Sequence, residues 1–353
     1  MKKSFSKISA LILASFLMVG PSLMASESSE ASQASESQEV QESQGTQESQ
    51  TTTSSNLEEI AKTFDLRTYA QYDKVMGQDE KNILEFLLQL PTKNLTADLN
   101  LTVDAKADAH TTYVVTYAGK MQKNSDNELS LLGKANINIS DAFKIEQEPE
   151  VTITLDPSST DSEKKYIVTT KSNFPGEGPQ IDTQELKVDE NTNKVLDVVS
   201  KLKYDLRQVE EKDGSLKILA LIPIEENIDE LVPYAAEKGY LDQNGEKLSE
   251  EKQKEGIEKM HEGIDKVKKA TNIETLVLPI NLTYSTDSKA ITAISLDLAS
   301  YIEMYMKIMA TTGENINTPN AMNFIDNVTI NKMEFALENI VPQEDKITIE
   351  VAK

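Results

Sequence analysis

The stretch that decides the fold is residues 95–105, which read LTADLNLTVDA. Apolar side chains occupy every second position, and Thr, Asp and Asn occupy the positions between them. Successive side chains of a strand point to opposite faces of its sheet, so this period of two predicts a long strand with one buried face and one wetted face. The same alternation predicts further strands at residues 113–117, 129–139, 151–155, 166–169, 204–210, 214–222, 276–284, 294–308, 328–337 and 347–351.

Most of these segments are separated by short gaps that contain turn residues. Lys123-Asn124-Ser125-Asp126 and Lys212-Asp213-Gly214 are two examples. Consecutive strands joined by short turns predict an antiparallel meander. Near Asn331-Lys332 the alternation slips by one residue, which is typical of a β-bulge.

Apolar residues spaced three and four apart predict helices between the strands. Helical stripes at 57–69 and 83–90 precede the first long strand, and Pro91 is expected to end the second of them. Further helices are predicted at 195–202, 226–238 and 249–270. The last of these is highly charged, and its narrow apolar seam predicts packing against one partner only. That seam consists of Ile257, Met260, Ile264 and Val267.

Together these patterns predict an α+β protein that is rich in strands. Because each strand buries one face only, we expect one large curved antiparallel sheet, an open half-barrel with helices on its concave side. A sheet split into two packed layers would satisfy the same alternation. The expected domain is 57–353, with a helical insertion at about 225–271.

The first 25 residues have the pattern of a signal peptide. Lys2, Lys3 and Lys7 precede an apolar run that ends at Gly20 and is shorter than the roughly 20 residues that a membrane helix needs. An uncleaved anchor is the alternative interpretation. Residues 26–56 are rich in Ser, Glu and Gln, so we expect a disordered linker, which is either a spacer or an inert tail. The sequence therefore predicts a secreted, extracellular protein.

Composition excludes several classes of function. The formal net charge of −23 argues against nucleic acid as a partner, since binding it requires basic side chains that neutralise phosphates. With no cysteine, the chain has no disulfides, thiol catalysis or cysteine–zinc sites. His110 and His261 belong to no metal or catalytic motif, and no nucleophile elbow is present. We therefore expect no enzymatic activity, no metal and no cofactor.

The order of elements resembles that of a known group of exported proteins, the LolA-like and LppX/LprG-like lipoproteins, including uncharacterised Gram-positive members. The similar features over about 80–353 are a helix, long amphipathic strands, mid-chain helices, further long strands and late methionines. Leu23-Met24-Ala25 also has the shape of the segment that precedes a lipidated cysteine, but Ser26 follows it here. We therefore expect a secreted or surface-associated protein without a lipid anchor, a sorting tail or, after cleavage, a membrane-spanning segment.

This resemblance implies a hydrophobic cavity between the sheet and the helices that accepts a lipid or another apolar ligand. Methionine suits such a lining, because its side chain is flexible and polarizable. The expected lining residues are Ile294, Leu296, Leu298, Ile302, Met304, Met306 and Ile308. The alternative is a filled core, in which case the protein would be a surface module that binds a cell-surface protein.

Overall fold

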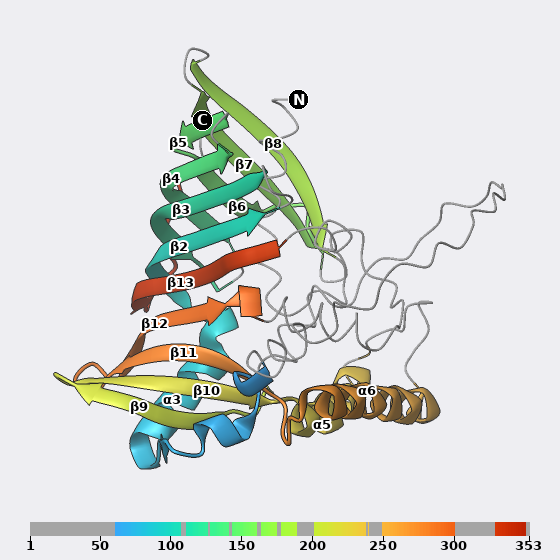
Figure 1. The fold of residues 1–353 in the computed structure, drawn as a ribbon. Coiled ribbons are helices and arrows are strands. Elements are labelled where there is room, and N and C mark those ends of the chain that lie inside the picture. The colour runs from blue at the N-terminus through green and yellow to red at the C-terminus, as the bar shows by residue number, and fades with distance from the viewer. Residues whose placement is uncertain are drawn as a thin grey trace, which may run out of the picture.

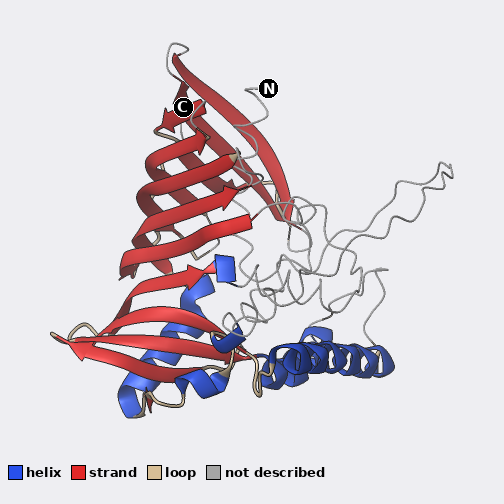
Figure 2. Ribbon diagram, in the orientation of Figure 1, coloured by secondary structure: helices blue, strands red, loops and turns tan. Residues whose placement is uncertain are grey.

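The structure is a computed structural model, and its helices and strands are shown in Figure 2. It describes residues 61–106, 111–125, 128–140, 143–160, 164–174, 178–188, 201–237, 239, 249–300 and 329–350. The expected signal peptide and linker lie outside these ranges, so both stay predictions.

The first run of strands is the predicted meander, which begins with residues 95–105. Each strand pairs antiparallel with the next, except that β4 pairs with β6 through its first residues and with β5 through its last ones. The strands are β2 (Asn94–Lys106), β3 (Thr112–Lys123), β4 (Leu129–Ile139), β5 (Phe143–Gln147), β6 (Glu150–Leu155), β7 (Lys164–Phe174) and β8 (Gly178–Val188).

A second run of strands comes mainly from the later part of the chain. It contains β1 (Asp73–Lys74), β9 (Asp205–Lys212), β10 (Ser215–Pro223), β11 (Val277–Ser285), β12 (Ala290–Asp297) and β13 (Thr329–Gln343). The hairpin between β9 and β10 turns at Asp213-Gly214, as predicted. Both residues have positive φ angles, 49° and 73°, which a two-residue hairpin turn of type I′ requires.

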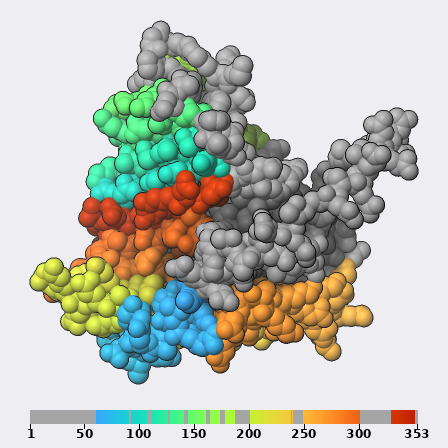
Figure 3. Space-filling model, in the orientation of Figure 1, coloured from blue at the N-terminus to red at the C-terminus, as the bar shows by residue number. Residues whose placement is uncertain are grey.

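Strand β13 joins the two runs into one sheet. It pairs with β12 along one side and with β2 along the other, and Figure 3 shows it as a band between them. The resulting sheet has 13 strands in the described part of the chain and is antiparallel throughout, with β1 and β8 as its edges. It is strongly curved and not closed (Figure 1), which confirms the predicted open, strand-rich architecture.

The predicted slip near Asn331-Lys332 is a β-bulge. The register between β13 and β2 shifts between Ile330 and Lys332, and the Asn331 amide donates a hydrogen bond of 3.0 Å to Asp104. A second shift follows Glu338, in the part of β13 where Asn339 has a φ of 50°. Bulges increase the local twist of a strand pair, so both contribute to the curvature of the sheet.

Helix α3 (Gly77–Gln89) covers part of the concave face of the sheet. It is the helix predicted from the 83–90 stripe, and it passes into a short turn, η3 (Leu90–Thr92), that contains Pro91. Ile83, Phe86 and Leu87 are buried in one core with inward-facing residues of β2, β4, β6 and β10. Buried side chains of α3 therefore pack directly against those of the strands beneath it.

Helices α5 (Ile224–Glu237) and α6 (Glu250–Thr271) form a pair that projects beyond the ends of β10 and β11 (Figure 1). Ile264 of α6 is buried in a second core with Ala61 and Phe64, which precede the short helix η2 (Leu66–Tyr69). Met260 was predicted to lie on the same seam. That prediction is wrong, because Met260 is 48% exposed.

The long strand predicted at 294–308 is shorter than expected. Strand β12 ends at Asp297, and residues 298–300 are helical. The Asp297 carboxylate accepts hydrogen bonds from Ala299 N (3.1 Å) and Ser300 Oγ (2.7 Å). A carboxylate at this position satisfies backbone N–H groups that a first helical turn leaves unpaired, and this local effect outweighs the alternation. Residues 301–308 lie outside the described residues.

Further differences concern three strands and parts of two predicted elements. Strands β1, β5 and β8 were not predicted. In β8, which is a sheet edge, polar side chains do not alternate clearly with apolar ones. The strand predicted at 347–351 is wrong in the described part, since residues 344–350 form no strand. Residues 201 and 202, the described end of the helix predicted at 195–202, are also not helical.

Candidate functional site

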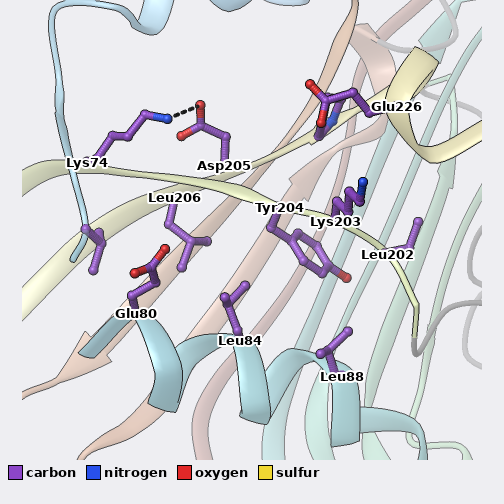
Figure 4. A pocket seen from close by; sticks show the side chains of 12 residues that line it. Lys74, Glu80, Leu84, Leu88, Leu202, Lys203, Tyr204, Asp205, Leu206 and Glu226 are labelled. Carbon is purple, nitrogen blue, oxygen red and sulfur yellow. Dashed lines mark ion pairs between the residues drawn. The ribbon is translucent and has the colours of Figure 1, made fainter. Parts of the chain in front are cut away.

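A cleft of about 450 Å³ opens beside the filled core, between helix α3 and the segment that leads into β9. We call it the α3 cleft, and Figure 4 shows it from close by. Its apolar lining consists of Val75, Leu84, Leu88, Leu202, Leu206 and Pro223. Its polar lining consists of Tyr204 and five charged residues, Lys74, Glu80, Lys203, Asp205 and Glu226.

One wall of the α3 cleft is a flank of the α3 helix. Leu84 and Leu88 are one turn apart and therefore lie on the same side of the helix. Each is the neighbour in sequence of a core residue, Ile83 or Leu87, so the apolar arc of the helix extends beyond its fully buried side chains. Leu84 and Leu88 remain partly exposed, and they face the α3 cleft.

The opposite wall is residues 202–206, which the buried side chain of Asn227 on α5 holds in place. Its Oδ1 accepts a hydrogen bond of 2.8 Å from Lys203 N, and its Nδ2 donates to the carbonyls of Lys203 (3.2 Å) and Pro223 (2.7 Å). At the other end of the wall, Val75 N donates to Leu206 O at 3.0 Å. The wall is thus fixed to α5 and to the segment before α3.

Tyr204 is the polar group in the middle of this wall. Figure 4 shows its ring pointing from the wall toward Leu84 and Leu88. Burial raises the pKa of Tyr204 to about 12, so its hydroxyl group is protonated at neutral pH. Within the described residues, no hydrogen-bond partner of this hydroxyl is found. It can therefore donate a hydrogen bond to a bound molecule.

Charged residues form the rim of the α3 cleft. Lys74 Nζ lies 3.5 Å from Asp205 Oδ2, and the same oxygen accepts a hydrogen bond of 2.8 Å from Arg207. Lys203 forms an ion pair with Glu230 on α5. The hydrogen bond to Glu230 raises the pKa of Lys203, although partial desolvation opposes the rise. The rim is therefore held together by ion pairs between its own residues and their neighbours.

Three of the residues predicted to line a cavity are described, and they lie outside the α3 cleft. Ile294 is buried in the core opposite Leu337, and Leu296 is half-buried opposite Phe335. Leu298 lies in the helical turn that follows β12. None of these three lines the α3 cleft. Ile302, Met304, Met306 and Ile308 lie outside the described residues, so the proposed lining by these four stays a prediction.

Sequence reasoning missed the residues that do line the α3 cleft. Leu84 and Leu88 carried a usable signal, because they widen the apolar arc of the helix beyond the stripe that ends at Leu90. Leu202 and Tyr204 carried none, since nothing local indicates that an extended segment before β9 will meet a helix more than a hundred residues earlier.

Metal and histidine chemistry is not indicated in the described residues. They contain no group of three or more metal-binding side chains. His261 Nε2 lies 2.7 Å from Asp229 Oδ1, so this histidine links α6 to α5. His110 lies outside the described residues. No helix in the described ranges is long and apolar enough to cross a membrane.

No protein-family model and no curated protein matches the chain. The crystal structure of LprF from Mycobacterium bovis is similar to it, with 9% sequence identity and a TM-score of 0.31, covering 80% of this chain and 99% of that chain. A TM-score this low supports no argument about the fold group or the function of this chain.

Proposed function

We propose that the protein is an exported, non-enzymatic binding protein that holds a lipid or another amphipathic ligand in the α3 cleft. The observation that carries the proposal is the apolar wall of Leu84 and Leu88, which faces the unpaired hydroxyl group of Tyr204. Small-molecule sites typically combine apolar walls with a few polar groups in a volume of about 300–1,000 Å³. The α3 cleft has an apolar wall but a more polar rim than most such sites, since six of its twelve lining residues are apolar, and its volume lies in that range.

The lining supports binding rather than covalent catalysis. It contains no serine, threonine, cysteine or histidine. Nucleophilic catalysis typically needs such a side chain next to a base within hydrogen-bonding distance. The groups present instead suit a ligand with an apolar body and a polar end.

The alternative is a surface module that binds another protein and has a filled core. The packing beneath α3 fits that interpretation, since Ile83, Phe86 and Leu87 are buried in one core with side chains of the sheet. The α3 cleft lies beside this packing and is not explained by it. We therefore prefer ligand binding, and the experiment below decides between the two.

The experiment measures binding of the uncharged dye N-phenylnaphthylamine to the protein that begins at Ser26. The chain contains no tryptophan, so the dye fluorescence has little background from the protein. We expect saturable binding that is lost in Leu88→Glu, which places a charge in the apolar wall. The matched control is Leu132→Glu, because Leu132 on β4 is 58% exposed and does not line the α3 cleft.

Two outcomes would overturn ligand binding at this site. One is an absence of saturable dye binding to a folded protein. The other is equal loss of binding in the Leu88→Glu and Leu132→Glu variants. Either result would favour the protein-binding alternative. Export is tested separately by sequencing the protein recovered from culture medium, and we expect its first residue to be Ser26.

A further inference from the structure

The charges around the α3 cleft are not balanced. Its lining contains two lysines, Lys74 and Lys203, and three carboxylates, Glu80, Asp205 and Glu226. Whether these charges attract a ligand depends on which of them are already paired within the protein.

Both cations have an anionic partner. Lys74 lies 3.5 Å from Asp205, which also accepts a hydrogen bond from Arg207. Lys203 forms its ion pair with Glu230, and Glu226 adds to the negative field around it. An anionic ligand group would have to compete with these carboxylates for either lysine.

The two other carboxylates are differently placed. Within the described residues, Glu80 and Glu226 form no ion pair and no hydrogen bond that would neutralise them. Figure 4 shows Glu80 on α3 at one end of the α3 cleft and Glu226 near α5 at the other end. Each lies in the first turn of its helix, where a negative charge is favourable, so neither carboxylate needs an ion pair to be retained there.

We propose that the α3 cleft selects a cationic amphiphile, with its apolar chain along Leu84 and Leu88 and its amine at Glu80 or Glu226. The inference rests on the proposed function, because it assumes that the α3 cleft binds an amphipathic ligand. A site can gain specificity by repelling the wrong ligand as well as by attracting the right one, and these carboxylates would repel an anionic head group. The net charge of −23 further disfavours the approach of anionic lipids.

The test compares three probes of equal chain length, decylamine, decanol and decanoate, by their displacement of N-phenylnaphthylamine at low salt. Decylamine is expected to displace the dye at about fivefold to tenfold lower concentration than decanoate, the effect of one or two partly exposed ion pairs. High salt should reduce that preference, since exposed charges are screened.

A pair of double variants assigns the effect to the α3 cleft. In Glu80→Gln/Glu226→Gln the preference for decylamine over decanoate should fall to about twofold or less, while decanol displaces the dye as before. Glu85→Gln/Glu237→Gln is the matched control, because it removes two exposed carboxylates from the same two helices outside the α3 cleft. This control should keep the full preference.

The outcomes separate the two proposals. If the dye does not bind at all, the proposed function fails and the inference fails with it. If the dye binds but decanoate displaces it as well as decylamine does, only the inference on charge is overturned. The same holds if the preference survives in Glu80→Gln/Glu226→Gln or falls equally in the control. If the preference is lost in Glu80→Gln/Glu226→Gln and kept in the control, the single variants Glu80→Gln and Glu226→Gln show which end of the α3 cleft receives the amine.

Discussion

Asn124 shows how one side chain can take the place of a strand partner. It is fully buried in the turn between β3 and β4. Its Oδ1 accepts a hydrogen bond of 2.7 Å from Ile347 N, and its Nδ2 donates one of 2.8 Å to Ile347 O. Lys346 also forms an ion pair of 2.9 Å with Glu128. The Asn124 side chain therefore holds the segment after β13 in place, although that segment pairs with no strand.

Asn124→Ala should lower the free energy of unfolding by about 2–3 kcal/mol, because it leaves the Ile347 N–H and C=O groups without partners. Urea unfolding followed by circular dichroism measures the loss. Asn100→Ala is the control, since the exposed Asn100 side chain makes one hydrogen bond, to Glu338. The control should change stability by less than about 0.5 kcal/mol. Equal losses in the two variants would contradict a special role for Asn124.

Asp65 connects the N-terminal part of the described chain to the end of α6. Its Oδ2 accepts hydrogen bonds from Arg67 Nε (2.8 Å) and Nη2 (2.5 Å), and Nη2 also donates to Asn272 O. Burial raises the pKa of Asp65, but the hydrogen bonds from the Arg67 side chain and backbone N–H outweigh burial. The pKa of Asp65 in the folded protein is therefore below its usual value.

The lowered pKa predicts a pH dependence of stability. A carboxyl group whose pKa is lower in the folded state stabilises the fold above its unfolded pKa, about 3.9, and this contribution is lost as the pH falls through the folded value. Asp65→Asn should therefore lower stability at neutral pH and weaken the further loss on acidification. Urea unfolding at a series of pH values measures both effects. Asp73→Asn, at an exposed site on β1, should keep the wild-type profile, and identical profiles for Asp65→Asn and wild type would refute the linkage.

At the scale of elements, helix α6 contains two glycines at positions where a larger side chain would fit. A Cβ atom added at Gly256 or Gly263 would meet no atom within 4 Å. Gly119 and Gly133 differ, because they face each other on β3 and β4. A Cβ atom at Gly119 would lie 2.5 Å from Leu132 O and 2.7 Å from the Tyr117 hydroxyl oxygen.

Replacing the α6 glycines should therefore stabilise the protein. Gly256→Ala and Gly263→Ala are each expected to add about 0.5–1 kcal/mol, because glycine in a helix interior costs backbone entropy. Gly119→Ala should instead cost about 1–3 kcal/mol, since neighbouring backbone must move. Thermal unfolding distinguishes the two signs. A lower melting temperature for both α6 variants would contradict the free space around Gly256 and Gly263.

At the scale of the whole molecule, the sheet depends on its last strand. Strand β13 is the only link between β12 and β2 in the described sheet order. Without it, the two runs of strands would each expose an unpaired edge and part of the shared core. The fold therefore depends on pairing between strands that are far apart along the chain.

A chain that ends at residue 328 should lose the cooperative unfolding transition and aggregate. Removal of residues 26–56, the predicted linker, should leave the transition unchanged, because that segment has too few apolar residues to join a core. Calorimetry of both shortened proteins makes the comparison. A cooperative transition in the chain without β13 would show that the first run of strands folds alone.

Local patterns predicted much of the fold. The alternation in β2 to β4, the Asp213-Gly214 turn, the bulge at Asn331 and the helices α3, α5 and α6 all followed from residues close together in sequence. The misses have physical causes. The Asp297 carboxylate ends β12 by capping a helical turn, and β8 needs to pair along one side only, so its sequence is not constrained to alternate.

The candidate site was less predictable than the fold. By itself the sequence determined which faces of the strands and helices are apolar, because side-chain direction follows the local backbone period. Only the tertiary structure decided that β13 lies between β12 and β2, and that Leu84 and Leu88 meet Tyr204 across a cleft. Those meetings depend on contacts between residues distant along the chain, which leave no periodic signal in either segment.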